Sequence, residues 1–164
     1  MHVGREEPGE GQESVWDYPR PPMIEDCTAR IRVVVCEFTV ADSTNSKRVL
    51  ETSHPPVYYI PPQDVSVTCL KLSDHMSWCE WKGSARYYAL TIGDQTVSDV
   101  AWCYPDPAPR FAELQDHLAF YPSKADACYV DDELVRPQKG DFYGGWITEQ
   151  IVGPFKGGPA TMRW

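Results

Sequence analysis

From Ile31 onward the chain consists of short runs rich in β-branched residues, and this pattern predicts a β-rich protein. The run IRVVVCEFTVADS predicts a hairpin that turns near Cys36–Glu37, and a later hairpin is expected to turn at Asp131–Asp132. The runs KRVLETS and VYYI predict further short strands; the proline pairs that flank VYYI mark its ends, because proline cannot donate to a strand ladder. The alternating run VSVTCLKL, residues 65–72, predicts another strand.

The clearest hairpin is predicted within SARYYALTIGDQTVSDVAWCY, residues 84–104. Gly93–Asp94 suits a two-residue type II′ turn, whose first position favours glycine. That turn would place two pairs of residues opposite each other: Ile92 with Gln95, and Leu90 with Val97.

One segment, DPAPRFAELQDHL at residues 106–118, has the pattern of a helix. Asp106 can cap it, a proline lies near its first turn, and Phe111, Leu114 and Leu118 fall on one stripe. The sequence therefore predicts a mainly β, antiparallel, single-domain fold with one short helix.

The texture of the chain changes at both ends of this pattern. Residues 1–26 are acidic and rich in proline and glycine, so we expect a mobile arm that Trp16 and Tyr18 can pin to the domain. Residues 27–137 form the expected β domain. Residues 138–164 hold six of the 11 glycines and five large aromatic residues, and they predict an irregular tail that packs on the domain.

Net charge and cysteine content limit the classes of partner and the cellular compartment that we expect. Lysine and arginine number 15 against 24 acidic residues, so the formal charge of −9 argues against nucleic acid and anionic membranes as partners. The chain has no apolar run of about 18 residues, and its start lacks the basic and apolar regions of a secretory signal. Six cysteines without a C-x-x-C pair then indicate reduced thiols and a cytoplasmic protein, and no oligomeric state is predicted.

Several strings occur in an order that resembles the domain-of-unknown-function family 427, which sometimes bears a nucleotidyltransferase-like label. They are ADST, ETSHPPVYYIPPQDV, CEWKGSARYY, AWCYPDP, HLAFYP and FYGGWIT followed by VGPFKGG. The resemblance covers about residues 30–137, and the glycine-rich tail is similar to the longer variants of that family. It implies a compact β-tent-like fold with two small antiparallel sheets, and it implies no particular reaction. Glu80 stands where the family motif usually has proline.

The stretch SWCEWKGSARYY, residues 77–88, holds the candidate chemistry. If a turn forms around Gly83, Lys82 can fold back toward Cys79, and a lysine beside a thiol favours the thiolate. Cys79 and Lys82 are therefore candidate catalytic residues. The alternative is a buried thiol beneath an aromatic hairpin, with Lys82 in solvent.

Aromatic residues from adjacent predicted strands form a second candidate feature. They include Tyr87, and they are too many for a core of this size to bury with every hydroxyl paired. We therefore expect some of them to line a cleft around Trp81 and Lys82. The expected ligand-binding residues are Tyr58, Tyr59, Trp81, Lys82, Gly83, Tyr88, Trp102 and Tyr104.

No metal site or cofactor is expected. His75 and Cys79 form the only closely spaced pair of zinc-ligand types, and the chain has no phosphate-binding G-x-x-x-x-G-K-[ST] loop for nucleotidyl transfer. The leading interpretation is a domain that binds an unknown small molecule in the aromatic cleft. An enzyme with Cys79 as nucleophile and a protein-interaction module remain as alternatives.

Overall fold

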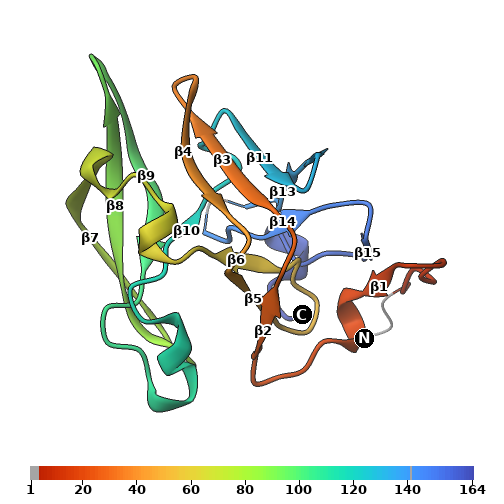
Figure 1. The fold of residues 1–164 in the computed structure, drawn as a ribbon. Helices are drawn as coiled ribbons and strands as arrows, with labels where there is room; N and C mark the ends of the chain where they lie inside the picture. The colour runs from red at the N-terminus through yellow and green to blue at the C-terminus, as the bar shows by residue number, and fades with distance from the viewer. Residues whose placement is uncertain (1–3, 141) are drawn as a thin grey trace.

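Two four-stranded antiparallel sheets face each other and enclose the main hydrophobic core (Figure 1). The computed structural model describes residues 4–140 and 142–164. The first sheet has the order β10-β9-β8-β7, with β7 (Leu70–Cys79), β8 (Gly83–Ile92), β9 (Gln95–Cys103) and β10 (Ala119–Phe120). The second has the order β12-β11-β3-β4, with β3 (Ile31–Val35), β4 (Phe38–Ser43), β11 (Ala127–Val130) and β12 (Glu133–Leu134).

Smaller elements complete the fold. A three-stranded antiparallel sheet contains β2 (Met23–Cys27), β5 (Ser46–Leu50) and β6 (Val57–Tyr59). Two short pairs are β13 (Arg136–Pro137) with β14 (Trp146–Ile147), and β1 (Glu13–Ser14) with β15 (Ile151–Val152), the latter parallel. The helical segments are all of 3-10 type: η1 (Val15–Asp17), η2 (Pro62–Asp64), η3 (Val67–Cys69), η4 (Pro109–Leu114) and η5 (Pro159–Thr161). The predicted mainly β, antiparallel, single-domain fold is thus confirmed.

The three hairpin turns predicted from turn-forming residues are confirmed. Cys36 and Glu37 have φ of 51° and 65° between β3 and β4, as a tight primed turn requires. Gly93 has φ of 57°, and both predicted pairs across that hairpin form, Ile92 with Gln95 and Leu90 with Val97. Val130 pairs with Glu133 around the predicted turn at Asp131–Asp132.

The helix is shorter and tighter than its sequence predicts. It spans only η4, and Ala108, which has no side-chain cap, precedes it in place of Asp106. Ala108 is extended (φ −53°, ψ 149°) because Pro109 follows it, so the helix cannot begin earlier. Phe111 and Leu114 are buried as expected, but Leu118 lies beyond the helix and packs in the core between the sheets.

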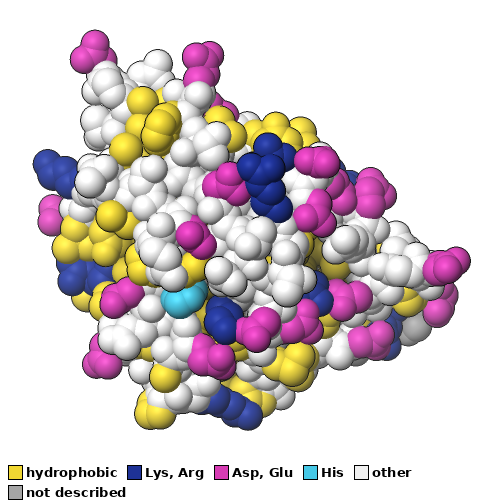
Figure 2. All heavy atoms as spheres, viewed as in Figure 1, with side chains coloured by type: hydrophobic (Ala, Val, Ile, Leu, Met, Phe, Trp, Pro, Cys, Tyr) yellow, Lys and Arg dark blue, Asp and Glu magenta, His cyan; other side chains and the backbone are white. Residues whose placement is uncertain are grey.

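The strand predicted at residues 65–72 begins late. Cys69 donates its backbone N–H to the Ser66 carbonyl (3.1 Å), which closes η3 where strand was expected. β7 starts only at Leu70 and continues to Cys79. It forms an edge of its sheet, and Figure 2 shows hydrophobic side chains gathered over this left-hand edge of the molecule.

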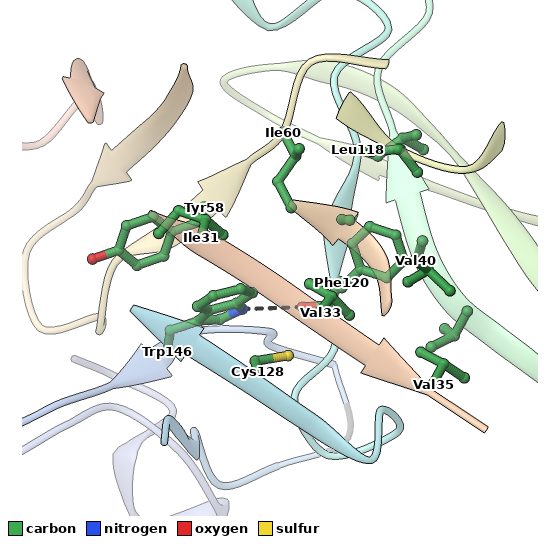
Figure 3. Packing of buried hydrophobic residues seen from close by; sticks show 14 of the residues in the cluster. Ile31, Val33, Val35, Val40, Tyr58, Ile60, Leu118, Phe120, Cys128 and Trp146 are labelled. Atoms are coloured by element: carbon green, nitrogen blue, oxygen red, sulfur yellow. Dashed lines mark hydrogen bonds between the residues drawn. The ribbon is translucent and has the colours of Figure 1, made fainter. Parts of the chain in front are cut away.

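The core between the two sheets is largely aliphatic. Both sheets and the tail contribute side chains to it, as Figure 3 shows for Val33 and Val35 of β3, Phe120 of β10 and Trp146 of β14. The indole N–H of Trp146 donates to the Phe120 carbonyl at 3.1 Å, so its one polar atom is paired despite near-complete burial.

The segments on either side of the expected domain are joined to it and to each other. Ile24 pairs with Val49, so the boundary expected between residues 26 and 27 falls inside β2. β1 pairs with β15 of the tail, and the Trp16 indole N–H donates to the Pro154 carbonyl at 2.8 Å. Arm and tail therefore meet in the structure.

Candidate functional site

A cleft of about 440 Å³ opens on the face of the β10-β9-β8-β7 sheet that is turned away from the main core. Its walls come from β5, β6, the strands β7, β8 and β9 of this sheet, loops beside these strands, and the tail. Alternation along β7 and β8 places Ser77, Cys79 and Tyr87 on this face. The volume lies within the range of small-molecule sites.

The turn between β7 and β8 brings Lys82 to Cys79. Cys79 pairs with Gly83, so residues 80–82 form the turn, and Gly83 takes φ of 103°, which favours glycine. The Lys82 carbonyl accepts from the Ala108 N–H at 3.0 Å, which fixes the end of the turn. The Lys82 ammonium lies 3.6 Å from the Cys79 sulfur, as the folded-back lysine requires.

Lys82 is a buried cation. Only 8% of the residue is exposed, and within the described chain no carboxylate lies within 4.0 Å of its ammonium. Its other neighbour is the face of the Tyr104 ring, 5.7 Å away. Burial lowers the pKa of the ammonium, but Tyr59, Cys79 and Glu51 outweigh burial and leave that pKa above its usual value. Lys82 is therefore positively charged at neutral pH.

Aromatic rings form a continuous wall beside this charge. The centroid of Tyr59 lies 6.3 Å from those of both Tyr104 and Trp102, and the centroids of Trp102 and Tyr121 are 4.5 Å apart. Burial raises the pKa of the Tyr59, Tyr104 and Tyr121 hydroxyls, so all three are neutral at physiological pH. The wall offers flat apolar surface with uncharged polar edges.

The opposite side carries His54 and Glu51. Burial, then the charges of Lys156, Arg20 and Lys82, lower the pKa of His54 to about 3, so its imidazole is neutral. The Glu51 carboxylate lies 3.4 Å from both His54 Nε2 and an Arg20 guanidinium nitrogen. Glu51 is thus already paired with a cation other than Lys82.

The tail closes the cleft through close backbone approach. A Cβ at Gly144 would lie 2.3 Å from the Trp102 ring, so only glycine lets the tail lie flat there. Gln138 ties the tail together, because its amide accepts from the Gly145 N–H (3.1 Å) and donates to the Lys156 carbonyl (2.6 Å). The Tyr121 hydroxyl donates to the Phe142 carbonyl at 3.1 Å.

A pair of hydroxyl groups lies farther along β7. Ser77 Oγ and the Tyr87 hydroxyl are 2.8 Å apart, and both residues line the cleft. The His75 ring stacks on Tyr87 at 4.0 Å, while its Nδ1 lies 3.0 Å from an Asp99 carboxylate oxygen. Tyr87 is thereby held from two sides.

The structure brings together five of the eight expected ligand-binding residues. Tyr59, Trp81, Lys82, Trp102 and Tyr104 line the cleft, together with Cys79. Tyr58 instead packs on Trp146 in the main core, and Tyr88 lies on the opposite face of its sheet, where its hydroxyl is 3.7 Å from the Cys103 sulfur. Gly83 shapes the turn without lining the cleft.

Sequence reasoning did not assign several lining residues to the site. The omission of Tyr87 had a usable signal, because once Cys79 pairs with Gly83, period-two alternation places residue 87 on the face of Cys79. His54, Gln138, Tyr143 and Lys156 reach the cleft only through the folded positions of loops and tail. No local pattern marks them.

Over residues 4–140 and 142–164, no three His, Cys, Asp or Glu side chains gather as a metal site would require. No helical segment of the same ranges combines the length and apolar character needed to cross a membrane.

Comparison with known proteins places the chain in a family. No curated protein matches the sequence. The family model described as "Domain of unknown function (DUF427)" matches residues 23–131, about two thirds of the chain. The matched part contains Cys79, Lys82 and the ring wall, while the tail side of the cleft lies outside it. The chain therefore belongs to the DUF427 family.

Proposed function

We propose that the protein binds a small negatively charged molecule in the cleft beside Lys82. The observation that carries the proposal is a lysine that is 8% exposed, lacks a carboxylate partner in the described chain, and lines a cleft. A buried charge is costly unless it is paired, so a site that keeps one favours a ligand of opposite charge.

The surroundings of Lys82 support a ligand with an apolar body. Trp81, Trp102 and the tyrosine rings offer contact area that an inorganic ion would leave uncovered. Aromatic walls with a few convergent polar groups are typical of pockets for organic ligands. The cleft volume of about 440 Å³ is also larger than a simple ion needs.

The second candidate function is thiol chemistry at Cys79. The 3.6 Å contact between the Lys82 ammonium and the Cys79 sulfur favours it, because a nearby cation stabilises a thiolate. We place binding first because His54, the histidine among the described lining residues, contacts Glu51 and Tyr143, and no hydrogen bond joins it to Cys79 in the described chain. Interaction with another protein ranks lower, since the tail aromatics Tyr143 and Trp146 are already used within this chain.

A thermal-shift screen of small organic anions on the full chain tests the proposal. We expect hits that stabilise the wild type and Cys79→Ser but not Lys82→Met, which keeps most of the lysine stem and removes the charge. A thiol enzyme would instead bind its substrate in Cys79→Ser and lose turnover. Hits that stabilise Lys82→Met as strongly as the wild type would show that this cleft is not the site.

A further inference from the structure

We infer that the ligand is a planar aromatic monoanion that carries a neutral hydroxyl or amide group at the end opposite its charge, as a para-hydroxylated aromatic acid does. The inference rests on the proposed function and adds the ligand's charge number, shape and second polar group. Three features of the cleft lead to it, one for each property.

The charge number follows from how the charged lining residues are already used. Glu51 is paired with Arg20, the Lys156 ammonium donates to the Trp164 carbonyl at 3.1 Å, and Glu80 is exposed. Lys82 remains as the buried charge whose neighbours are a thiol and a ring face. The one ammonium at the Cys79 end of the cleft matches one anionic group. A second negative charge beside Tyr87 would meet the field of Asp99, whose carboxylate lies 3.0 Å from the His75 ring that stacks on Tyr87.

The second polar group follows from the Ser77–Tyr87 pair. Two hydroxyls have two hydrogens, and their mutual 2.8 Å bond uses one of them. The pair keeps one donor and free lone pairs but carries no charge. It therefore suits a hydroxyl or an amide, and a carboxylate there would lack a cation.

The spacing of the two anchors sets the size of the ligand. Ser77 and Cys79 are two residues apart on one face of β7, and that separation is about 6.6 Å in a strand. Lys82 sits at Cys79, so the charged and neutral anchors lie about one aromatic ring apart. The flat wall of Tyr59 and Trp102 lines the same cleft, and offset or edge contacts with it favour a planar ligand.

Four probes separate these properties by titration calorimetry with the full chain: 4-hydroxybenzoate, benzoate, 4-hydroxybenzamide and terephthalate. We expect 4-hydroxybenzoate to bind most tightly, with a loss of about tenfold or more for each of the others, because each lacks one anchor or adds a charge. Equal affinity for 4-hydroxybenzamide and 4-hydroxybenzoate, or preference for terephthalate, would overturn the inference.

Matched variants assign each anchor. The double variant Ser77→Ala/Tyr87→Phe should remove the advantage of 4-hydroxybenzoate over benzoate, because it removes both hydroxyls of the pair. Lys82→Met should remove the advantage of 4-hydroxybenzoate over 4-hydroxybenzamide. Ser84→Ala, on the exposed opposite face of the same hairpin, should leave both ratios unchanged. If the double variant Ser77→Ala/Tyr87→Phe keeps the wild-type ratio of affinities for 4-hydroxybenzoate and benzoate, the far anchor is wrong.

The inference and the proposed function can fail separately. If none of the four probes binds while other anions in the screen depend on Lys82, the ligand class is wrong and the cleft stands as a binding site. If no anion of either set requires Lys82 for binding, both the inferred ligand class and the proposed function are wrong.

Discussion

The two faces of the β10-β9-β8-β7 sheet are built from different kinds of side chain. The face toward the second sheet packs mainly aliphatic residues, and the indole N–H of Trp146, which enters this core from the tail, is paired. The other face gathers Tyr59, Tyr87, Tyr104 and Tyr121 around Trp102, and it holds a buried lysine. Both faces bury large side chains, but only the second also buries many polar atoms.

This difference distinguishes the side chains that stabilise the fold from those that are available for a function. Apolar packing alone is enough to hold two sheets together, whereas each buried hydroxyl needs a partner and a buried ammonium adds a desolvation cost. The aromatic face thus carries features that folding does not require. Proteins tend to break local stability rules of this kind at functional sites.

The largest effect is expected on the aliphatic face. Trp146→Ala should lower the free energy of unfolding by about 3–5 kcal/mol, because it removes a 1% exposed indole and leaves a cavity. Denaturant titration measures the loss. Phe142→Ala, four residues earlier but 59% exposed, should cost less than about 0.5 kcal/mol. Similar losses in the two variants would mean that the tail does not enter the core.

The second-largest loss of stability is expected where the tail contacts the aromatic face. Gly144→Ala puts a methyl group 2.3 Å from the Trp102 ring, so we expect a loss toward the upper end of about 1–3 kcal/mol. Gly4→Ala is a matched control, because nothing lies within 4 Å of its Cβ position. An unchanged unfolding midpoint for Gly144→Ala would show that the tail does not lie flat on Trp102.

A residue beside the aromatic face, His54, should make the free energy of unfolding depend on pH. The pKa of His54 is about 3 in the folded protein and about 6.5 in an unfolded chain. The contribution of neutral His54 to the free energy of unfolding is therefore complete above pH 6.5. It is lost as the pH falls toward 3, and the loss is about 2 kcal/mol at pH 5. Unfolding titrations at pH 7 and pH 5 should show that His54→Gln reduces the wild-type difference by this amount. An equal difference in both proteins would mean that His54 is accessible to protons.

The smallest effect is expected at the exposed edge of the sheet. Trp78 is 69% exposed on β7, and Trp78→Ala should change the free energy of unfolding by less than about 0.5 kcal/mol. A loss above about 1 kcal/mol would place Trp78 within the packed part of the aromatic face and would blur the contrast between the faces. The same denaturant titration decides this.

Local signals were enough for the hairpins and for the Lys82–Cys79 approach, because glycine and turn residues act over a few positions. Adjacent aromatic residues were harder. Neighbours in a strand point to opposite faces, so Tyr58 and Tyr59 separate into different clusters, as do Tyr87 and Tyr88. The sequence shows such a pair, but the register decides which member enters the cleft.

The rest of the site depends on contacts between distant segments. His54 lies in the loop between β5 and β6, while Lys156 and Gly144 belong to a tail whose composition predicts only irregular backbone. Their positions come from Gln138, whose amide joins two parts of the tail. The predicted start of the helix was wrong for a different reason. The restriction that Pro109 imposes on the backbone of Ala108 outweighed the capping potential of Asp106.

A protease that cuts the exposed stretch before β1 would reach the cleft indirectly. Glu6 makes two hydrogen bonds to the tail at Gly153: its backbone N–H donates to the Gly153 carbonyl (2.9 Å), and its side-chain carboxylate accepts from the Gly153 N–H (3.0 Å). The tail held in this way supplies Tyr143 and Lys156 to the cleft. A nick among residues 7–11, which are all exposed, would release the attachment through Glu6, while β1 and Trp16 would still hold the tail at β15 and Pro154. Proteolysis would therefore loosen the tail side of the cleft first through a stretch of chain that does not line it.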